Sequence, residues 1–302
     1  MTALRERFQG AMAGIAVGDA LGFPVEGMET VPGGYPDDAF RRLEKFDYSD
    51  DTALSIALAE SLLACDGFDG SDMARRFSEV WAREPHRGYG ANVVKVFRSV
   101  GEGVDWKEAA ESQFGGSGSF GNGGAMRVVP VALWAYPDLE ETVRLATATA
   151  SVTHAHPVGM EGAVIQAIAA HHVLGDGFEP GRLLEDLDQR IETDRFRVKL
   201  ETVELCLERG DDQQARQHLG NSVAADGSVL TALYCFSIAA DFDDTVRRAI
   251  RIGGDTDTIA AMAGALAGAR YGLSAIPPDW RQVEGFDRMV ELGDALYQRV
   301  DR

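Results

Sequence analysis

The feature that most constrains the fold is a run of small residues near the end of the chain, GGDTDTIAAMAGALAGARYG at 253–272. Gly264, Gly268 and Gly272 recur every four residues, which leaves one face of a helix bare. Each interior glycine costs roughly 1 kcal/mol of helix stability relative to alanine. A second helix that packs closely on the bare face can offset that cost. The stretch therefore predicts a fold built on close helix–helix contacts.

Helical spacing of apolar residues continues through most of the sequence. Alternating strand patterns joined by Asn-Gly or Asp-Gly hairpins are not found, so we predict an all-α fold. The chemically interesting loops extend from Asp19 to Thr258, and one pocket would need both ends of the chain, which favours a single domain over 1–302. The predicted helices are 4–17, 52–65, 71–83, 91–100, 125–135, 140–151, 159–174, 181–208, 228–240, 244–252, 258–271 and 284–300.

Two of these helices begin with paired carboxylates beside hydroxyls, in YSDDT at 48–52 and GGDTDT at 253–258. Helix capping explains one acid in each motif, because Asp, Ser and Thr accept hydrogen bonds from the free N–H groups of a first turn. If the two helix starts meet, four carboxylates share one pocket and need protons or cations to compensate them. Oxygen ligands without Cys or clustered His suit Mg²⁺ or Mn²⁺ better than Zn²⁺. Two independent caps and one shared metal site both remain open.

A glycine-rich loop, FGGSGSFGNGGAMRVVP at 114–130, is a third candidate element. Its glycines let backbone N–H groups approach an anion, as in a phosphate cradle. It is not a Walker A loop, because no Gly-Lys-Ser/Thr follows, and no strand precedes it as in a Rossmann fingerprint. Phe114 and Phe120 flank the glycines and can stack a nucleobase, or alternatively fill the core beneath a flexible connection. RGYGANVV at 87–94 is a smaller glycine turn that enters a helix.

Other polar residues stand in short loops. His154 and His156 lie in THAHP at 153–157. Two His at this spacing can bind zinc, but no third soft ligand has a suitable spacing, so we favour a histidine that hydrogen-bonds a polar ligand. Asp19, at the end of the first predicted helix, is expected to have a structural partner. Glu26 lies in a Gly/Pro loop, where a solvated surface acid is the ordinary expectation.

The composition narrows the class of protein. The net charge is −19 at pH 7 and only four of the 29 basic residues are Lys, which argues against general nucleic-acid binding because such a surface repels phosphates. The apolar run at 11–18 is too short to span a bilayer and lacks a signal-peptide cleavage pattern, so we expect a cytoplasmic protein without a membrane segment. Three scattered Cys argue against a disulfide framework and against a Cys-rich zinc site.

Taken together, these motifs resemble those of the ADP-ribosylglycohydrolase family, which includes the dinitrogenase-reductase-activating glycohydrolases. GDALGFPVE, YSDDT, GNGGAMR, THAHP and GGDTDTIAAMAGALAGARYG follow in the family's order over more than two hundred residues. RGYGANVVKVF, SFGNGGAMRV and LGNSVAADGSVLTALYCF are more similar to the branch that cleaves ADP-ribosyl-serine, O-acetyl-ADP-ribose and poly(ADP-ribose). The resemblance implies a compact, orthogonal all-α domain with two Mg²⁺ ions (or Mn²⁺) at the base of an ADP-ribose cleft. We expect a monomer that acts on ADP-ribosylated proteins or other ADP-ribose conjugates.

Carried over by position, the resemblance implies that the two acidic motifs bind the metals together and that Glu26 is the catalytic residue. This chain has Ser49 where the family usually has Thr, and the hydroxyl ligand is retained. Relatives often have Tyr at the position of Phe120. The implied metal ligands are Ser49, Asp50, Asp51, Asp255, Asp257 and Thr258, and the implied ADP-ribose contacts are Gly88, Phe114, Ser119, Phe120, Gly121, Asn122, Gly123 and His154.

The implied reaction is hydrolysis of the glycosidic bond at the anomeric carbon of ADP-ribose, through an oxocarbenium-like state. Glu26 would either activate water or assist the leaving hydroxyl, and the sequence does not distinguish these roles. One alternative is an N-glycosidic hydrolase of ADP-ribosyl-arginine, as in the dinitrogenase-reductase-activating enzymes. Another is a non-catalytic ADP-ribose reader or structural homologue, against which the retained acids of both motifs and Glu26 argue.

Overall fold

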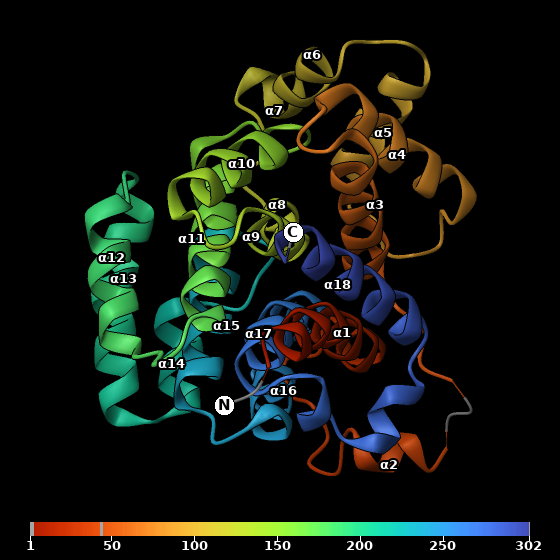
Figure 1. Cartoon of the computed structure of the whole chain (residues 1–302). Helices are drawn as coiled ribbons and strands as arrows, with labels where there is room; N and C mark the ends of the chain where they lie inside the picture. The colour runs from red at the N-terminus through yellow and green to blue at the C-terminus, as the bar shows by residue number, and fades with distance from the viewer. Residues whose placement is uncertain (1–2, 43–44, 302) are drawn as a thin grey trace.

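A computed structural model describes residues 3–42 and 45–301 of the chain. Within these residues the regular structure is helical, apart from an isolated β-bridge between Gly121 and Ala224, so the all-α prediction is confirmed. Helices α1 and α17 lie near the centre of Figure 1, with α18 beside them. The α-helices are α1 (Leu4–Gly22), α2 (Asp37–Phe40), α3 (Asp50–Cys65), α4 (Gly70–Arg83), α5 (Ala91–Gly101), α6 (Trp106–Glu111), α7 (Gln113–Gly116), α8 (Gly123–Met126), α9 (Val129–Ala135), α10 (Leu139–Ser151), α11 (Pro157–Leu174), α12 (Pro180–Arg190), α13 (Asp194–Arg209), α14 (Asp212–Leu219), α15 (Ala225–Ile238), α16 (Phe242–Arg251), α17 (Thr256–Tyr271) and α18 (Phe286–Val300). The 3₁₀ helices are η1 (Phe23–Val25), η2 (Leu273–Ala275) and η3 (Pro278–Gln282).

The centre of the fold is the close contact between α1 and α17, which run antiparallel. Gly14 of α1 faces Gly264 of α17, and Gly10 faces Gly268. A Cβ atom at any of these four positions would overlap the facing backbone. The close helix partner predicted from the bare glycine face is therefore α1. Gly272 is the C-cap of α17 with a φ of 83°, and its backbone also lies against α1, since a Cβ at Gly10 would be 2.7 Å from the carbonyl carbon of Gly272.

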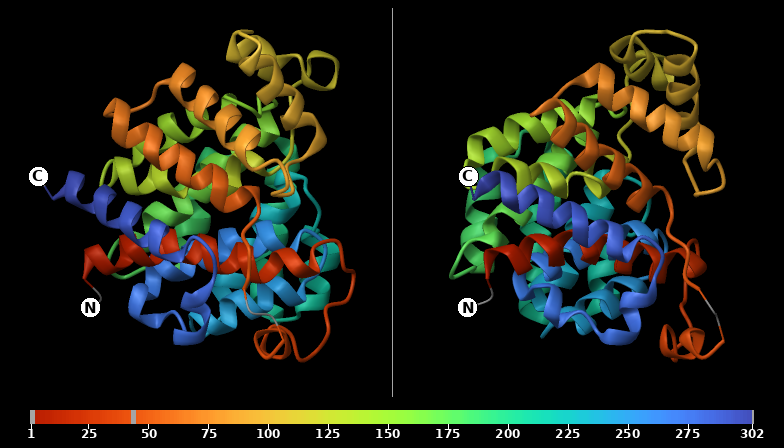
Figure 2. Two further views of the ribbon diagram at one scale, coloured as in Figure 1. Left: turned by 90° about the vertical axis from the view of Figure 1, so that its right-hand side faces the viewer. Right: turned by 45° about the vertical axis from the view of Figure 1, so that its right-hand side comes forward.

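This antiparallel pairing places the end of α1 beside the start of α17. A Cβ at Gly22 would meet the backbone of Thr256 and Asp257. On another side of α1, a Cβ at Gly293 of α18 would lie 2.7 Å from the Cα of Gln9 and 2.8 Å from the carbonyl oxygen of Phe8, and Figure 2 shows the two helices side by side in both views. The loops that follow α1 and precede α17 are thereby brought to the same end of the central pair.

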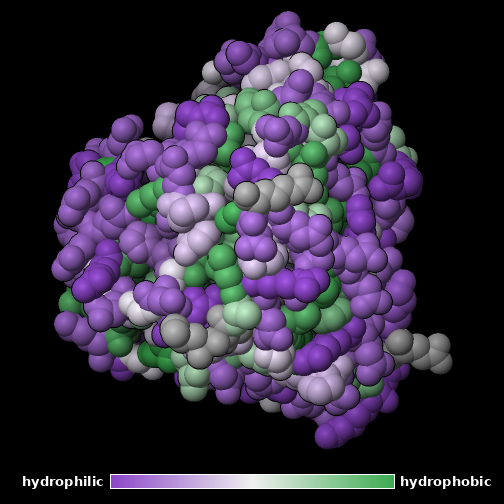
Figure 3. Space-filling model, in the orientation of Figure 1, coloured by the Kyte–Doolittle hydropathy of each residue, from purple (hydrophilic) through white to green (hydrophobic). Residues whose placement is uncertain are grey.

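The core extends outward from this pair over most of the molecule. Helices α11, α15 and α17 are buried on nearly every face, which fits their uniformly apolar or small residues. The face shown in Figure 3 is mostly hydrophilic, with smaller hydrophobic areas among the hydrophilic residues. Within the described residues, none of the helices combines the length and the apolarity that a membrane span needs.

The predicted helix 181–208 is wrong, because the structure divides it into α12 and α13. The buried carboxylate of Glu161 accepts hydrogen bonds from the backbone N–H of Glu192 at 2.5 Å and of Thr193 at 3.1 Å. It also accepts the hydroxyl of Thr193. A polar group on a neighbouring helix thus satisfies N–H groups that a continuous helix would pair internally.

The predicted helix 125–135 is also divided, into α8 and α9. Pro130 lies in the first turn of α9, where its missing N–H costs nothing, whereas inside one continuous helix it would remove a hydrogen bond. Helices α2, α6, α7 and α14 were not predicted, since each has eight residues or fewer and shows little periodicity. Helix α1 continues to Gly22, beyond the predicted end at residue 17.

Candidate active site

The acids of the two predicted motifs lie side by side. Ser49 is the N-cap of α3: its Oγ accepts the backbone N–H of Asp51 at 3.3 Å and donates to Asp51 Oδ2 at 3.2 Å. Thr258, in the first turn of α17, donates its hydroxyl to the same Oδ2 at 3.2 Å. Asp255 occupies the N-cap position of α17, but its side chain makes no capping hydrogen bond. Independent capping therefore does not account for these acids, and the two helix starts form one cluster.

Asp19 of α1 holds the start of α3 in place. Its buried carboxylate accepts the backbone N–H of Ser49 at 2.9 and 3.0 Å. It also accepts the N–H of Thr52 at 3.0 Å and its hydroxyl at 2.6 Å, which identifies the expected structural partner of Asp19. Oxygen atoms of Asp19, Asp51 and Asp257 lie within 4.8 Å of one another. The acidic cluster thus draws on α1, α3 and α17.

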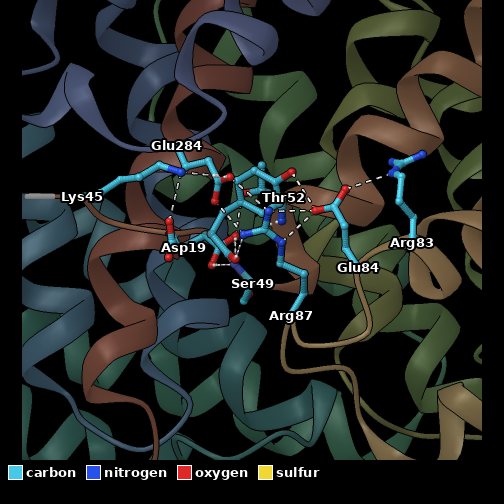
Figure 4. A network of polar contacts seen from close by, with 10 residues as sticks. Asp19, Lys45, Ser49, Thr52, Arg83, Glu84, Arg87 and Glu284 are labelled. Atoms are coloured by element: carbon cyan, nitrogen blue, oxygen red, sulfur yellow. Dashed lines mark hydrogen bonds and ion pairs between the residues drawn. The ribbon is translucent and has the colours of Figure 1, made fainter.

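Arg87 fixes the turn that enters α5, as Figure 4 shows. Its guanidinium donates to Glu284 at 2.6 and 3.1 Å and to Glu84 at 2.9 Å. It also donates to the carbonyl oxygen of Tyr48 at 3.1 Å and stacks on that ring, with Cζ 3.8 Å from the centroid. The carbonyl oxygen of Arg87 accepts the N–H of Asp50 at 2.7 Å. This network joins the glycine turn at 87–90 to the start of α3.

The Gly-Gly pair ahead of the second acidic motif docks the loop that carries Glu26. Gly253 and Gly254 have φ values of 76° and 77°, which favour glycine. The N–H of Gly27 donates to the carbonyl oxygen of Gly254 at 2.8 Å, and the N–H of Gly254 donates to that of Met28 at 2.9 Å. These two hydrogen bonds fix the 26–28 segment beside the start of α17.

Glu26 consequently faces the acidic cluster. An oxygen of its carboxylate lies within 4.8 Å of oxygens of Asp255 and Asp257. The side chain is exposed on its outer side. Partial burial of the carboxyl, followed by the negative charges of Asp255 and Asp19, raises the pKa of Glu26. It is therefore not an isolated surface acid but a proton-binding group at the edge of the cluster.

The glycine-rich loop is fixed to the segment that precedes α15. The N–H of Asn122 donates to the carbonyl oxygen of Val223 at 2.9 Å, and the N–H of Ala225 donates to that of Phe120 at 3.1 Å. The backbone N–H of Asn122 is therefore engaged within the protein, and the loop is held as a short paired segment rather than as a free connection.

Side chains of the loop reach toward the acids. The amide of Asn122 donates to Asp255 Oδ2 at 2.6 Å and to the hydroxyl of Ser228 at 3.0 Å. Both amide protons are thus used within the protein, so that Asn122 orients Asp255. The N–H of Gly121 donates to Ser119 Oγ at 3.3 Å. The loop and the start of α17 thereby form one continuous surface.

The two phenylalanines of this loop lie at the surface, so the alternative that they fill the core is wrong. Phe114 is 51% exposed and Phe120 is 39% exposed. Their ring centroids are 5.9 Å apart with planes at 34°, the geometry of a contacting aromatic pair. Arg195 of α13 lies 5.2 Å from the Phe120 centroid and His156 makes an edge contact with that ring. A flat ligand can stack on the open faces of this pair.

The two histidines of THAHP act separately. His156 is the N-cap of α11, and its Nδ1 accepts the N–H of Val158 at 3.1 Å. His154 is buried beside the glycine-rich loop, where a Cβ at Gly123 would lie 2.7 Å from its Cε1. Burial, followed by the positive charge of Arg127, lowers the pKa of His154 to about 3, so the ring is neutral.

One cleft connects these elements. It encloses about 440 Å³. Ser49 and Asp51 lie beneath its floor, with exposures of 0% and 1%. The acids occupy one part of the cleft, the aromatic pair another, and the glycine-rich loop joins them. The predicted site residues that line it are Glu26, Asp50, Gly88, Phe114, Ser119, Phe120, Gly121, Asn122, Gly123, His154, Asp255, Asp257 and Thr258.

The charge of the cluster is not compensated by protein groups. Among the described residues no Lys or Arg forms an ion pair with its aspartates, and the buried Oδ1 atoms of Asp51 and Asp257 have no hydrogen-bond partner. Burial, then the charges of Asp19 and Asp255, raises the pKa of Asp50 to about 8. Burial likewise raises the pKa values of Asp51 and Asp257. Orphaned carboxylate oxygens in a negative, oxygen-lined site fit hard divalent cations.

Sequence reasoning missed several residues that position this site, notably Arg87, Arg127 and Thr153. Arg87 binds Glu284, which is 197 residues away in the chain. Arg127 binds Thr153 across 26 residues. Such partners are adjacent only after folding, and no local spacing rule identifies them.

Comparisons with known proteins agree with this architecture. The family model described as ADP-ribosylglycohydrolase matches residues 1–302. ADP-ribosylhydrolase ARH3 of Mus musculus is 38% identical, covering 97% of this chain and 91% of the relative. The Homo sapiens protein of that name is 36% identical over 97% and 93% of the two chains. The ADP-ribosyl-[dinitrogen reductase] glycohydrolase of Rhodospirillum rubrum is 30% identical over 92% and 90%.

A solved structure has the same fold. The chain described as "ADP-ribosylglycohydrolase-related protein complex" superposes with a TM-score of 0.76 at 32% identity, and the match covers 98% of each chain. The matches to the family model, to the relatives and to the solved structure each cover nearly the full length of this chain. The chain therefore belongs to the ADP-ribosylglycohydrolase family and is a glycosidic-bond hydrolase.

Proposed function

We propose that the chain is a Mg²⁺-dependent hydrolase that cleaves the O-glycosidic bond at the anomeric carbon of ADP-ribose conjugates, such as ADP-ribosyl-serine, O-acetyl-ADP-ribose and poly(ADP-ribose). The observation that carries the proposal is the single cleft with orphaned acids at one part and an exposed aromatic pair at another. ADP-ribose has a matching order of groups: a ribose with free hydroxyls, a diphosphate and a base.

Two Mg²⁺ ions, with Mn²⁺ as the alternative, would be held by Ser49, Asp50, Asp51, Asp255, Asp257 and Thr258. The unpartnered Oδ1 atoms of Asp51 and Asp257 support this assignment, because each needs a partner that the described residues do not supply. When bound, the ions supply Lewis-acid polarisation and a template for the distal ribose hydroxyls. Asn122, through its hydrogen bond to Asp255, orients one of the ligands.

The remaining residues bind the ligand away from the acids. Phe114 and Phe120 offer a stacking surface to the adenine, and base–aromatic stacking contributes about 1–3 kcal/mol per base. Gly88, Ser119, Gly121, Asn122, Gly123 and His154 lie along the cleft where the diphosphate and ribose would pass.

Glu26 is the proposed acid–base. Its raised pKa brings it closer to neutral pH than that of an ordinary glutamate, which suits a group that takes and returns a proton. Its ionised carboxylate takes the proton of the attacking water, or its protonated carboxyl gives one to the leaving oxygen, while the sugar passes through an oxocarbenium-like state.

The proposal extends to a cytoplasmic monomer without general nucleic-acid affinity. All proposed site residues come from one chain, so the cleft needs no partner subunit. The net charge of −19 opposes binding to polyphosphate backbones.

Turnover of matched peptides tests the linkage. A peptide carrying ADP-ribosyl-serine and one carrying ADP-ribosyl-arginine are incubated with enzyme in Mg²⁺ or in EDTA. We expect rapid Mg²⁺-dependent release of ADP-ribose from the serine peptide. Faster release from the arginine peptide would instead support the activity for which the Rhodospirillum rubrum relative is named. Binding of ADP-ribose without turnover of either peptide would indicate a reader.

A further inference from the structure

A buried arginine at the cleft forms no ion pair with the described acids. Arg127 has no exposed surface. Its guanidinium donates to the carbonyl oxygen of Gly123, to that of Thr149 at 3.3 Å and to Thr153 Oγ1 at 2.7 Å. It also lies over the ring of Phe77, with Cζ 4.8 Å from the centroid. Burial lowers the pKa of Arg127 to about 9 against the smaller opposing effect of the negative charge of Asp50, so that Arg127 remains protonated at neutral pH and can only donate hydrogen bonds.

The hydroxyl of Thr153 accepts from Arg127. Among the described residues its single proton has no acceptor other than His154 Nδ1, which lies 2.7 Å away, so Thr153 donates to that nitrogen. The residue itself is firmly fixed, because its carbonyl oxygen accepts the side-chain amide of Gln113 at 2.6 Å and its N–H donates to Ala150 at 3.1 Å. Nδ1 of His154 is consequently an acceptor.

We infer that His154 is held as the neutral tautomer with its proton on Nε2, as a dedicated hydrogen-bond donor to the cleft, and that Arg127 and Thr153 are the positioning residues that fix this state. A neutral imidazole carries one proton, so an accepting Nδ1 requires a protonated Nε2. The low pKa of His154 keeps the ring from gaining a second proton near neutral pH.

The Nε2 edge of His154 is directed at the glycine-rich loop. A Cβ at Gly123 would lie 3.0 Å from Nε2, and one at Gly121 would lie 3.4 Å from it. His154 also lines the cleft, and among the described residues its Nε2 makes no hydrogen bond. A fixed N–H at this place suits an oxygen that can only accept, such as a phosphate oxygen. The consequence for ADP-ribose binding rests on the proposed function, whereas the tautomer does not.

The chain contains an internal control with the opposite arrangement. The carbonyl oxygen of Asp138 can only accept, so Thr142 Oγ1, 2.8 Å away, donates its proton to that oxygen. The same hydroxyl lies 3.2 Å from His171 Nδ1 and must accept from it. Burial, then the neighbouring His172, lowers the pKa of His171 to about 4. The two neutral rings should therefore be opposite tautomers, His154 with Nε2–H and His171 with Nδ1–H.

Nuclear magnetic resonance of the full chain labelled with ¹⁵N-histidine distinguishes the tautomers, because protonated and unprotonated ring nitrogens resonate far apart. The variants His154→Gln and His171→Gln assign the two sets of signals. At neutral pH we expect an unprotonated Nδ1 in His154 and a protonated Nδ1 in His171. Thr153→Val removes the hydroxyl at nearly constant volume and should let His154 populate the Nδ1–H form. Thr153→Ser restores the hydroxyl and should restore the wild-type signals.

ADP-ribose titrations on the same samples measure the consequence. Thr153→Val should raise the dissociation constant about 10- to 100-fold, as expected for losing a hydrogen bond to a charged acceptor, and Thr153→Ser should bind as wild type does. Protonation of His154 on Nδ1 in the wild type would overturn the inference. Unchanged ring signals in a folded Thr153→Val protein would overturn the relay. The predicted tautomer in a wild-type protein that does not bind ADP-ribose would support the inference and refute the proposed function.

Discussion

Replacing Asp257 by Asn should stabilise the metal-free protein while removing most of its stabilisation by Mg²⁺. An oxygen of Asp257 lies within 4.8 Å of oxygens of Asp19 and Asp51. Two unit charges at that distance repel by roughly 3 kcal/mol at an effective dielectric constant of 20. Protons shared by the cluster already relieve part of this repulsion, so we expect a gain of about 1–3 kcal/mol in the free energy of unfolding. Among the described residues, Oδ1 of Asp257 has no hydrogen-bond partner to lose.

The sign should reverse when Mg²⁺ is added. A ligand that binds only the folded state adds about 2.7 kcal/mol at a concentration of 100 times its dissociation constant. The wild type should gain stability of this order, and Asp257→Asn should gain much less because one charged ligand is missing. Urea unfolding followed by circular dichroism, in EDTA and in Mg²⁺, measures both effects on the same samples.

Asp188→Asn is a matched control, since it removes one negative charge from an exposed position on α12, away from the cluster. It should leave both the metal-free stability and the Mg²⁺ response near those of the wild type. A metal-free Asp257→Asn protein that is less stable than the wild type would refute the repulsion argument. An unchanged Mg²⁺ response would remove Asp257 from the proposed ligands.

Glu26→Gln should lower the hydrolysis rate about 10²–10⁴-fold while ADP-ribose binding stays near normal. Turnover and calorimetry on one preparation measure both. A wild-type rate would mean that Glu26 takes no part in the reaction. Phe120→Ala should weaken ADP-ribose binding by about 1–3 kcal/mol, and an unchanged dissociation constant would mean that the base does not stack there. Gly14→Ala should lower the free energy of unfolding by about 1–3 kcal/mol in urea titrations, because the new Cβ overlaps the backbone of Gly264. Because the pKa of His171 is lowered to about 4, the folded ring binds fewer protons than the unfolded ring between pH 6.5 and pH 4. Its contribution to stability is therefore present above pH 6.5 and lost as the pH falls toward 4. His171→Gln should flatten the pH dependence of the free energy of unfolding in that window.

Much of the fold could be predicted because the local spacing of glycines and apolar residues indicates which helix faces pack together. The glycines of 253–272 indicated a close helix partner, and the apolar spacing indicated the positions of most of the longer helices. The errors occur where a distant side chain decides the backbone. Glu161 accepts hydrogen bonds from the N–H groups between α12 and α13, and the sequence near 191–193 does not indicate that contact.

The candidate site was predictable to the extent that its residues stand at helix starts. Paired acids beside hydroxyls are visible as motifs, and the structure brings them together through the hydrogen bond from Thr258 to Asp51. What the sequence could not give is the set of contacts that orient them. Asp19 was expected only to have some structural partner, and its role in binding the start of α3 depends on a contact across 30 residues.

The glycine face also determines which acids can meet. In the observed register Gly10 faces Gly268 and Gly14 faces Gly264, and this places Gly22 against the backbone of Asp257. Sliding α1 along α17 by one turn would keep glycine opposite small residues at several positions but would move the loop after α1 by about 5 Å relative to the start of α17. Glu26 would then lie beyond the 4.8 Å that now relates its carboxylate to the acids of α17. The least reactive residues of the chain thus set the distances on which its chemistry depends.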